Sequence, residues 1–351
     1  MITDVLASLA AKRHLSRAEA ANLVDLLLSD EISDAQAGAI LMGMSMKGET
    51  AEELAGIAEA MRDRCPLVRT HHKIFIDTAG TGGDGVGTFN ISTATAIVTA
   101  ASGLPVAKHG NRAASSRSGS ADVLRALGVE IEMPTDVAGR LLDEIGVCFL
   151  YAPFYHDATR RVAEVRRQLQ IRTAFNYVGP LTNPARAPRQ LIGVGSNDAV
   201  ERVAKAAAML GIERAWVVHG DGLDEITVTG WTHVAAVRDG ELQEVFEIDP
   251  SAVGLPIRGH DSLRGGSPEE NAAIIEQIIS GDLENSAARE IVVLNTAAAL
   301  VIGDVATSLS EGIEIATVTL DSGRAIDTLE QLRHWPELIA SPAGEDATGA
   351  S

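Results

Sequence analysis

A glycine-rich segment after a short predicted strand has the composition of a phosphate-binding loop. The strand covers residues 73–78, and the segment from Gly80 to Gly87 contains five glycines. Glycines let the backbone approach a ligand closely and turn its amides inward. Ser92 and Thr93 then begin an apolar helix, whose amino end attracts an anion. A strand followed by a glycine loop and then by the first turn of a helix predicts a phosphate site rather than an ordinary turn.

The same glycines also match a dinucleotide-binding fingerprint. Their spacing is Gly80-x-Gly82-x-x-Gly85, and that fingerprint likewise follows a strand. It requires an acidic residue near the end of the next strand, about 20 residues on, to bind a ribose hydroxyl. The next predicted strand ends instead in Lys108 and His109. A cation there suits a second phosphate, so the dehydrogenase interpretation is disfavoured.

A second segment, residues 108–120, concentrates positive charge and hydrogen-bond donors. It contains one lysine, two arginines, four serines and two glycines in a chain that is acidic as a whole. Such donors can surround a pyrophosphate or a sugar phosphate. Two interpretations of Ser120 stay open, because it is a candidate ligand of the same site and also a candidate N-cap of the next helix.

Acidic residues follow a later apolar strand. Asp221, Asp224 and Glu225 come directly after the predicted strand of residues 215–218. Adjacent carboxylates in a turn beyond a strand end are good ligands for Mg²⁺, which bridges to phosphate oxygens. A solvated acidic turn is the alternative, but the two phosphate-type segments favour a metal site.

An arginine-rich stretch precedes the segment 176–184. Its arginines are Arg160, Arg161, Arg166, Arg167 and Arg172. A run of this kind usually forms a solvated helix face, yet arginine also binds a carboxylate through two parallel hydrogen bonds. We expect one or two of the five, at most, in a binding site.

Other reactive residue types are expected to be structural. His71 and His72 are interpreted as an exposed pair before the first strand, and Cys65 and Cys148 as buried thiols. No Ser-His-Asp or Cys-His arrangement can be assembled with support from a motif, so covalent catalysis is not indicated.

The elements that position these residues fall into two regions. Capping boxes begin three predicted helices in residues 1–66: Ser16 with Glu19, Ser33 with Gln36, and Thr50 with Glu53. From residue 73 to 340, apolar strands alternate with helices, which predicts an α/β domain with a mostly parallel central sheet flanked by helices. An Asp239-Gly240 pair predicts a hairpin. The small, polar tail 341–351 is expected to be disordered.

Composition narrows the class of protein further. With 351 residues, two packed units are expected. A formal net charge of −19 repels phosphate backbones and anionic membranes, so neither a nucleic acid nor a membrane is an expected partner. The amino terminus lacks the order of a signal peptide, and no apolar stretch reaches the ~20 residues that span a bilayer. A cytoplasmic protein is expected.

Taken together, these motifs resemble those of the anthranilate phosphoribosyltransferases of tryptophan biosynthesis. The matching segments are residues 77–93, 108–128, 165–184 and 217–229, with a further likeness at 264–272. The resemblance covers nearly the whole chain except the tail. It implies a helical domain of residues 1–66, with a helical contribution from about 165–185. This domain would be joined to a phosphoribosyl-binding α/β domain of residues 73–340 and would pair two chains into a homodimer.

That resemblance implies an activity and a set of site residues. The enzyme would transfer the phosphoribosyl group of 5-phosphoribosyl 1-pyrophosphate to the amine of anthranilate, giving N-(5-phosphoribosyl)anthranilate and pyrophosphate, with Mg²⁺ as cofactor. The donor would be bound by residues of both loops: Gly80, Gly83, Asp84, Thr88, Asn90, Ile91, Ser92, Thr93, Lys108, His109, Gly110, Asn111, Arg112, Ala113, Ala114, Ser115, Ser116 and Ser120.

Further roles follow from the same resemblance. Gly80, Asn111 and Arg166 would contact anthranilate, with Arg166 on its carboxylate and His156 as a weaker neighbour. The metal ligands would be Ser92, Asp224 and Glu225. Lys108 would stabilise the charge of the leaving group, and no acid–base residue is expected because an aromatic amine is already neutral at pH 7. The chain departs from the family pattern at residues 160–164 and at Gln170, where glycine is common.

The alternative interpretation is a pyrimidine nucleoside phosphorylase, from a family with a similar fold and a Lys-His-Gly loop. That family follows Lys-His-Gly with glycine, whereas this chain has Asn111. It also lacks the Asp224–Glu225 pair in this setting. A nucleic-acid-binding relative of the same fold would need a basic surface, which the net charge disfavours.

Overall fold

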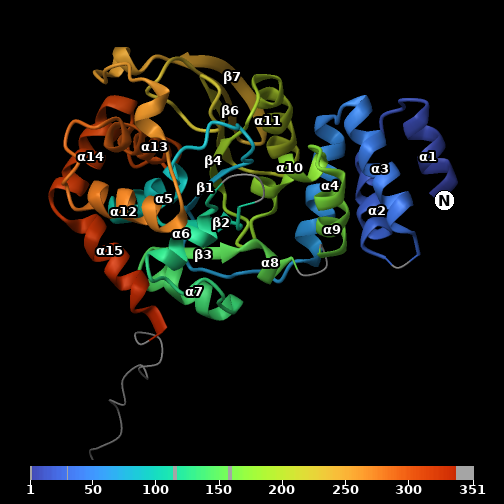
Figure 1. Ribbon diagram of the computed structural model, residues 1–351, viewed down its shortest axis with the longest axis horizontal. Coiled ribbons are helices and arrows are strands. Elements are labelled where there is room, and N and C mark those ends of the chain that lie inside the picture. Colours follow the sequence, from blue (N-terminus) through green and yellow to red (C-terminus); the bar gives the residue numbers. More distant parts are fainter. Residues whose placement is uncertain (1, 30, 114–116, 157–159, 337–351) are drawn as a thin grey trace, which may run out of the picture.

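The computed structural model describes residues 2–29, 31–113, 117–156 and 160–336. The predicted donor-binding residues Ala114, Ser115 and Ser116 lie outside the described residues, and so does the tail 341–351. A group of amino-terminal helices lies at one end of the molecule, beside a larger α/β unit (Figure 1). Within the described chain, no helix has the length and apolar character needed to cross a membrane.

The amino-terminal helices begin where the capping boxes predict. They are α1 (Ile2–Ala10), α2 (Arg17–Leu28), α3 (Asp34–Lys47) and α4 (Ala51–Arg64). All three predicted boxes form, since Ser16, Ser33 and Thr50 each accept the amide of the third helical residue. These caps satisfy amides that would otherwise lack an intrahelical partner. The apolar faces of the helices then pack together around Leu23, Ile40 and other buried side chains.

Two later helices lie against this bundle. After α8 (Ala152–Tyr155) come α9 (Arg160–Leu169) and α10 (Ala174–Val178), followed by the 3₁₀ turn η2 (Gly179–Thr182). The α9 helix contacts α2 and α3, while α10 contacts α3 and α4 (Figure 1). Val162 and Val165 share a core with the amino-terminal helices. This packing brings the arginine-rich stretch to the boundary between the bundle and the sheet.

Within the described residues the sheet has seven strands in the order β3-β2-β1-β4-β5-β6-β7. Their bounds are β1 (Ile76–Gly80), β2 (Val106–Gly110), β3 (Val147–Tyr151), β4 (Arg189–Gly193), β5 (Arg214–Gly220), β6 (Thr232–Arg238) and β7 (Glu241–Ile248). The first five in spatial order are parallel, and β6 and β7 are antiparallel additions. The predicted hairpin forms at Asp239 and Gly240, both with positive φ. The predicted fold class is confirmed.

Helices cover both faces of the sheet. One face packs on α5 (Ile91–Ala101), α6 (Ser120–Ala126), α12 (Pro268–Ile279), α13 (Ala287–Ile302), α14 (Leu309–Asp321) and α15 (Arg324–Arg333). The other face meets α11 (Val200–Met209), the amino-terminal bundle and α7 (Thr135–Glu144). Successive residues of a strand point to opposite faces of the sheet. In β2, Val106 is buried in the core on the α5 face and Ala107 in the core on the α7 face.

Because the central strands are parallel, their carboxyl ends share one edge of the sheet. The glycine loop follows β1, the second loop follows β2, and the acidic turn follows β5. Three segments far apart in sequence are therefore brought to the same edge, which is where open α/β sheets bind ligands.

Candidate active site at the carboxyl edge of the sheet

The glycine loop and the acidic turn are in direct contact. The amide of Gly82 donates to Asp224 Oδ2 over 2.7 Å. A Cβ added at Gly80 would collide with that same carboxylate. Gly82 and Gly83 have φ values of +66° and +78°, a region that favours glycine. The loop can lie this close to Asp224 only because these positions carry no side chain.

Lys108 connects β2 to the start of α5. Its ammonium donates to the carbonyl of Thr78 and, over 3.2 Å, to Ser92 Oγ. The side chain is almost fully buried, with 3% of its surface exposed. Burial lowers the pKa of Lys108, and nearby carboxylates, Asp77 first among them, oppose that shift. A buried cation is thus held at the amino end of a helix, where an anion would offset its charge.

Asn90 joins the two loops. Its Nδ2 donates to the carbonyl of Ser118 over 3.2 Å, and Ser118 Oγ donates to Asn90 Oδ1 over 3.0 Å. Asn271, at the start of α12, donates to the same Oδ1 over 2.9 Å. The end of the glycine loop and the described end of the second loop are therefore held side by side. Asn90 was a predicted donor-binding residue, whereas Asn271 lies in the resembling segment 264–272 and was given no role.

The N-cap of α6 is Gly119, so of the two interpretations left open for Ser120 the structure contradicts the N-cap one. The Asp122 carboxylate accepts the amides of Gly119 and Ala113 over 3.0 and 2.9 Å. A Cβ at position 119 would collide with the backbone of Ala113, so the cap position has no room for a side chain. Ser120 is the first helical residue, and its hydroxyl donates to the carbonyl of Asn111 over 3.2 Å.

Three carboxylates converge at the site. Burial, and then the nearby charge of Asp84, raise the pKa of Asp224 to about 6. Burial and the charge of Asp224 raise the pKa of Glu225 well above its usual range. A bound cation would offset the repulsion between these carboxylates and lower their pKa values again. A donor set made only of oxygen atoms suits a hard ion such as Mg²⁺. Asp84 was expected to bind the donor, and it also faces this acidic pair.

Asp221 takes no part in that cluster. Its Oδ2 lies 2.9 Å from His260 Nε2 and accepts the hydroxyl of Thr229 over 2.9 Å. The side chain is about half exposed. Of the acids in the turn, Asp224 and Glu225 are the two that meet the glycine loop and α5.

Arg166 lies on α9 at the boundary with the helical bundle. Its guanidinium carbon is 5.7 Å from the centre of the Phe175 ring, and Nη2 donates to Asn176 Oδ1 over 3.4 Å. Among the described residues, no carboxylate forms an ion pair with it. Burial lowers the pKa of Arg166. A partly buried guanidinium with this environment is suited to binding the carboxylate of a ligand.

Two buried histidines, His109 at the end of β2 and His156 just after α8, lie close together. The rings of His109 and His156 are 5.4 Å apart. Nδ1 of His109 lies 3.1 Å from the Gly179 carbonyl, and Nε2 of His156 lies 3.1 Å from that of Thr182. Burial is the main cause that lowers the pKa of His109 to about 3, and it also lowers the pKa of His156. Both rings are therefore neutral near pH 7.

Several other residues that were predicted to bind the donor make contacts within the protein. Thr88 forms an isolated β-bridge with Arg264. The Ile91 side chain is buried in the core between α5 and the sheet. Arg112 is exposed, and its guanidinium carbon lies 5.7 Å from the centre of the Tyr151 ring. A Cβ at Gly110 would collide with Ser120 Oγ.

Sequence reasoning missed two groups that support the site. Arg172 donates to the carbonyl of Gly83 over 3.0 Å and to that of Gly82 over 3.4 Å. Asp77 accepts the amide of His109 over 3.0 Å and the side chain of Asn183 over 2.7 Å. Arg172 belonged to the arginine run, and Asp77 begins the glycine motif, but neither pattern tells which backbone the side chain reaches.

Comparison with known proteins identifies the family. The helical bundle domain of the glycosyl transferase family matches residues 3–65, and the a/b domain of that family matches residues 72–326. The anthranilate phosphoribosyltransferase of Moorella thermoacetica is 44% identical over 342 residues, covering 97% of this chain and 100% of the relative. The chain belongs to the anthranilate phosphoribosyltransferase family. The family prediction is thereby confirmed.

Other anthranilate phosphoribosyltransferases are similar to this chain in sequence and in fold. That of Methylobacterium radiotolerans is 49% identical over 93% of this chain and 94% of the relative. The crystal structure of the Thermus thermophilus anthranilate phosphoribosyltransferase has a TM-score of 0.90 at 39% identity, covering 95% of this chain and 99% of that one. The Saccharomyces cerevisiae anthranilate phosphoribosyltransferase, solved in complex with PRPP and Mg, has a TM-score of 0.88 at 28% identity, covering 96% and 98%.

Proposed function

We propose that the loops and acidic turn at the carboxyl edge of the sheet are the active site of the family's reaction. The chain transfers the phosphoribosyl group of 5-phosphoribosyl 1-pyrophosphate to the amine of anthranilate, as an Mg²⁺-dependent enzyme of tryptophan biosynthesis. The observation that carries this proposal is the contact of the three segments, in which Gly82 meets Asp224 and Lys108 meets Ser92. Backbone amides, a buried cation and paired carboxylates at one place match a donor that is both polyanionic and metal-bound.

Donor binding is assigned to the two loops. The glycine loop, with Gly80, Gly83, Asp84 and Thr88, would bring backbone amides and short polar groups to the pyrophosphate. Residues 90–93 would present the start of α5 to a phosphate. The second loop, residues 108–116 with Ser120, would complete the site. The hydrogen bonds between Asn90 and Ser118 support this division because they hold the two loops together.

Ser92, Asp224 and Glu225 would hold Mg²⁺. Asp84 faces the same cluster and is a further candidate ligand. When bound, the ion would neutralise charge on the pyrophosphate and so favour its departure. The buried ammonium of Lys108 would add charge stabilisation on the protein side.

The acceptor would bind between the second loop and α9. Arg166 would hold the anthranilate carboxylate, with Gly80, Asn111 and the weaker neighbour His156 around the ring and amine. The amine nitrogen forms a bond to the anomeric carbon while the bond from that carbon to the pyrophosphate oxygen breaks, and pyrophosphate leaves with the electron pair. The amine proton passes to solvent. Because the aromatic amine is neutral at pH 7, orientation and charge stabilisation dominate catalysis.

We also propose domain limits, an assembly and a location for the chain. We assign residues 1–66 to the helical domain, with a contribution from about 165–185, and residues 73–340 to the phosphoribosyl-binding domain. A homodimer through the helical domain is supported by Met42 and Met46 on α3, whose surfaces are 37% and 72% exposed. A cytoplasmic location suits a biosynthetic enzyme with small-molecule substrates.

A two-substrate assay tests the proposed function. The full chain is mixed with anthranilate and 5-phosphoribosyl 1-pyrophosphate, with and without Mg²⁺. Anthranilate fluorescence should fall as pyrophosphate is released, and both signals should require the metal. Phosphorolysis of thymidine in place of this reaction would instead favour the nucleoside phosphorylase, and absence of both activities would refute the proposal.

A further inference from the structure

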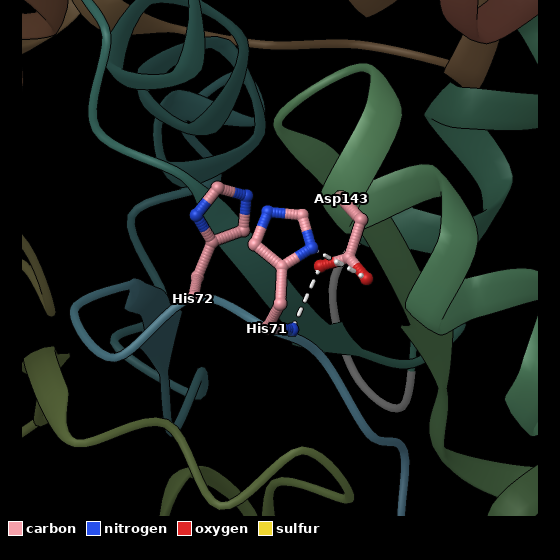
Figure 2. Close-up of side chains that lie close together, drawn as sticks. All are labelled: His71, His72 and Asp143. Atoms are coloured by element: carbon pink, nitrogen blue, oxygen red, sulfur yellow. Dashed lines mark hydrogen bonds and ion pairs between the residues drawn. The ribbon is translucent and has the colours of Figure 1, made fainter.

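His71, His72 and Asp143 form a cluster away from the active site. One ligand atom from each of the three lies within 4.8 Å of the other two, which makes this a candidate metal-binding group among the described residues. Figure 2 shows the His71 ring between the His72 ring and the Asp143 carboxylate. His71 Nδ1 lies 3.1 Å from Asp143 Oδ2, and the two imidazole rings are 4.4 Å apart.

We propose that His71, His72 and Asp143 bind a divalent transition-metal ion of the zinc type. Imidazole nitrogen with one carboxylate oxygen is a donor set that suits Zn²⁺ and its neighbours, whereas Mg²⁺ prefers oxygen alone. Three protein ligands leave a fourth position of the tetrahedron for water.

One of the three separations between ligand atoms already fits a coordination sphere. Two ligand atoms about 2.0–2.1 Å from a tetrahedral zinc lie about 3.3 Å apart. The 3.1 Å between His71 Nδ1 and Asp143 Oδ2 already matches that separation. The three ligand atoms lie within 4.8 Å of one another, so the His72 side chain must move closer to the other two when the ion binds.

An unsatisfied atom gives independent support. Nε2 of His72 is buried and has no hydrogen-bond partner among the described residues. A buried polar atom without a partner costs free energy, and a bound cation or its water would remove that cost. The Asp143 carboxylate, by contrast, is already oriented, because it accepts the hydroxyl of Thr70 and the amide of His71.

The cluster is separate from the proposed active site. His71 and His72 precede β1, and Asp143 lies in the last turn of α7, just before β3. All three are therefore at the amino edge of the sheet, while the glycine loop and the acidic turn follow the carboxyl ends of their strands. A metal here would cross-link the segment leaving the helical bundle to α7. Its expected effect is on stability, not on the chemistry.

Calorimetric titration of the full-length protein with Zn²⁺ tests this site. Mg²⁺ is present in large excess to occupy the oxygen-only cluster at Asp224 and Glu225. One Zn²⁺ per chain should bind and should raise the melting temperature, since a ligand that binds the folded state stabilises it. His72→Ala and Asp143→Asn should each weaken Zn²⁺ binding at least roughly 10-fold, the cost of losing even an outer partner of a metal ligand.

Matched variants separate this site from others. His71→Ala removes a ligand whose side chain is 68% exposed and should fold normally. His334→Ala removes an exposed histidine outside the cluster and should leave Zn²⁺ binding unchanged. The double variant Asp224→Asn/Glu225→Gln should also keep it. Binding that survives His71→Ala and His72→Ala together, or that disappears with the Asp224/Glu225 variant, would overturn the proposal.

Discussion

Arg172 Nη1 lies 3.0 Å from the carbonyl oxygen of Gly83, so a residue just beyond α9 holds the glycine loop from the side of the helical bundle. The guanidinium also stacks over Tyr177 at 5.5 Å, and the Arg172 carbonyl accepts the hydroxyl of Ser45 on α3 over 3.0 Å. The loop that is proposed to bind the donor is thus braced by the helical bundle and by α10.

Replacing Arg172 should weaken donor binding. Hydrogen bonds to charged groups contribute about 1.5–3 kcal/mol each, and these two are partly exposed, so the lower end applies. We expect Arg172→Ala to raise the KM for 5-phosphoribosyl 1-pyrophosphate roughly 10-fold, with a smaller change for anthranilate. Steady-state kinetics with each substrate varied in turn measure the difference. Arg167→Ala, which removes an exposed arginine paired with Glu164, is the control; equal effects of the two variants would contradict the bracing role.

Removing the two central carboxylates should depress turnover. Metal stabilisation of a developing charge contributes several kcal/mol, so Asp224→Ala/Glu225→Ala should lower kcat/KM by roughly 100-fold or more at limiting Mg²⁺. Asp221→Asn provides a control from the same turn, because Asp221 is bonded to His260 and Thr229 instead. Rates measured across a range of Mg²⁺ concentrations test this, and normal turnover of the double variant would rule out the ligand role.

Arg166→Ala should weaken the binding of anthranilate and leave the binding of 5-phosphoribosyl 1-pyrophosphate unchanged. The guanidinium contacts Phe175 and Asn176 but no described carboxylate, so its charge is available to anthranilate. Loss of a charge-assisted pair of hydrogen bonds should raise the KM for anthranilate roughly 10- to 100-fold. Arg166→Lys should recover only part of the affinity, because an ammonium lacks the planar fork. Equal losses for both substrates would argue against the carboxylate role.

Acid should destabilise the folded chain through His109. Burial, aided by the charge of His156 and Lys108, lowers its pKa from the usual 6.5 to about 3. Between these values the unfolded chain binds more protons than the native chain, so stability rises with pH. The contribution of neutral His109 to the free energy of unfolding is fully present above pH 6.5. It is lost as the pH falls toward 3, with a slope of at most about 1.4 kcal/mol per pH unit.

Urea unfolding at several pH values, without substrates or Mg²⁺, checks this dependence. His109→Asn keeps a donor for the Gly179 carbonyl and removes the titrating ring, so its stability should fall less steeply below pH 6.5. His334→Asn, at the exposed residue that follows α15, should follow the unmodified chain. Identical slopes for the unmodified chain and His109→Asn would show that the ring does not titrate in this way.

Residues close together in sequence were sufficient to predict much of the local structure. The capping boxes at Ser16, Ser33 and Thr50 bond within one helical turn, and the Asp239-Gly240 hairpin needs only its own positive φ values. The same reasoning could not decide between the two interpretations of Ser120. The N-cap is Gly119, and this position must be glycine because the Ala113 backbone, which belongs to the preceding loop, leaves no room for a side chain.

Local sequence patterns were enough to predict the capped helices, the glycine loop and the types of charge near each strand end, since φ preferences, caps and apolar spacing are local properties. Which of these groups meet depends on contacts between segments that are far apart in the chain. Gly82 and Asp224 are 142 positions apart, Arg172 and Gly83 are 89 apart, and Asn90 and Ser118 are 28 apart. Such pairs depend on the strand order and on the packing of the helical bundle against the sheet, and no single segment of the chain carries that information.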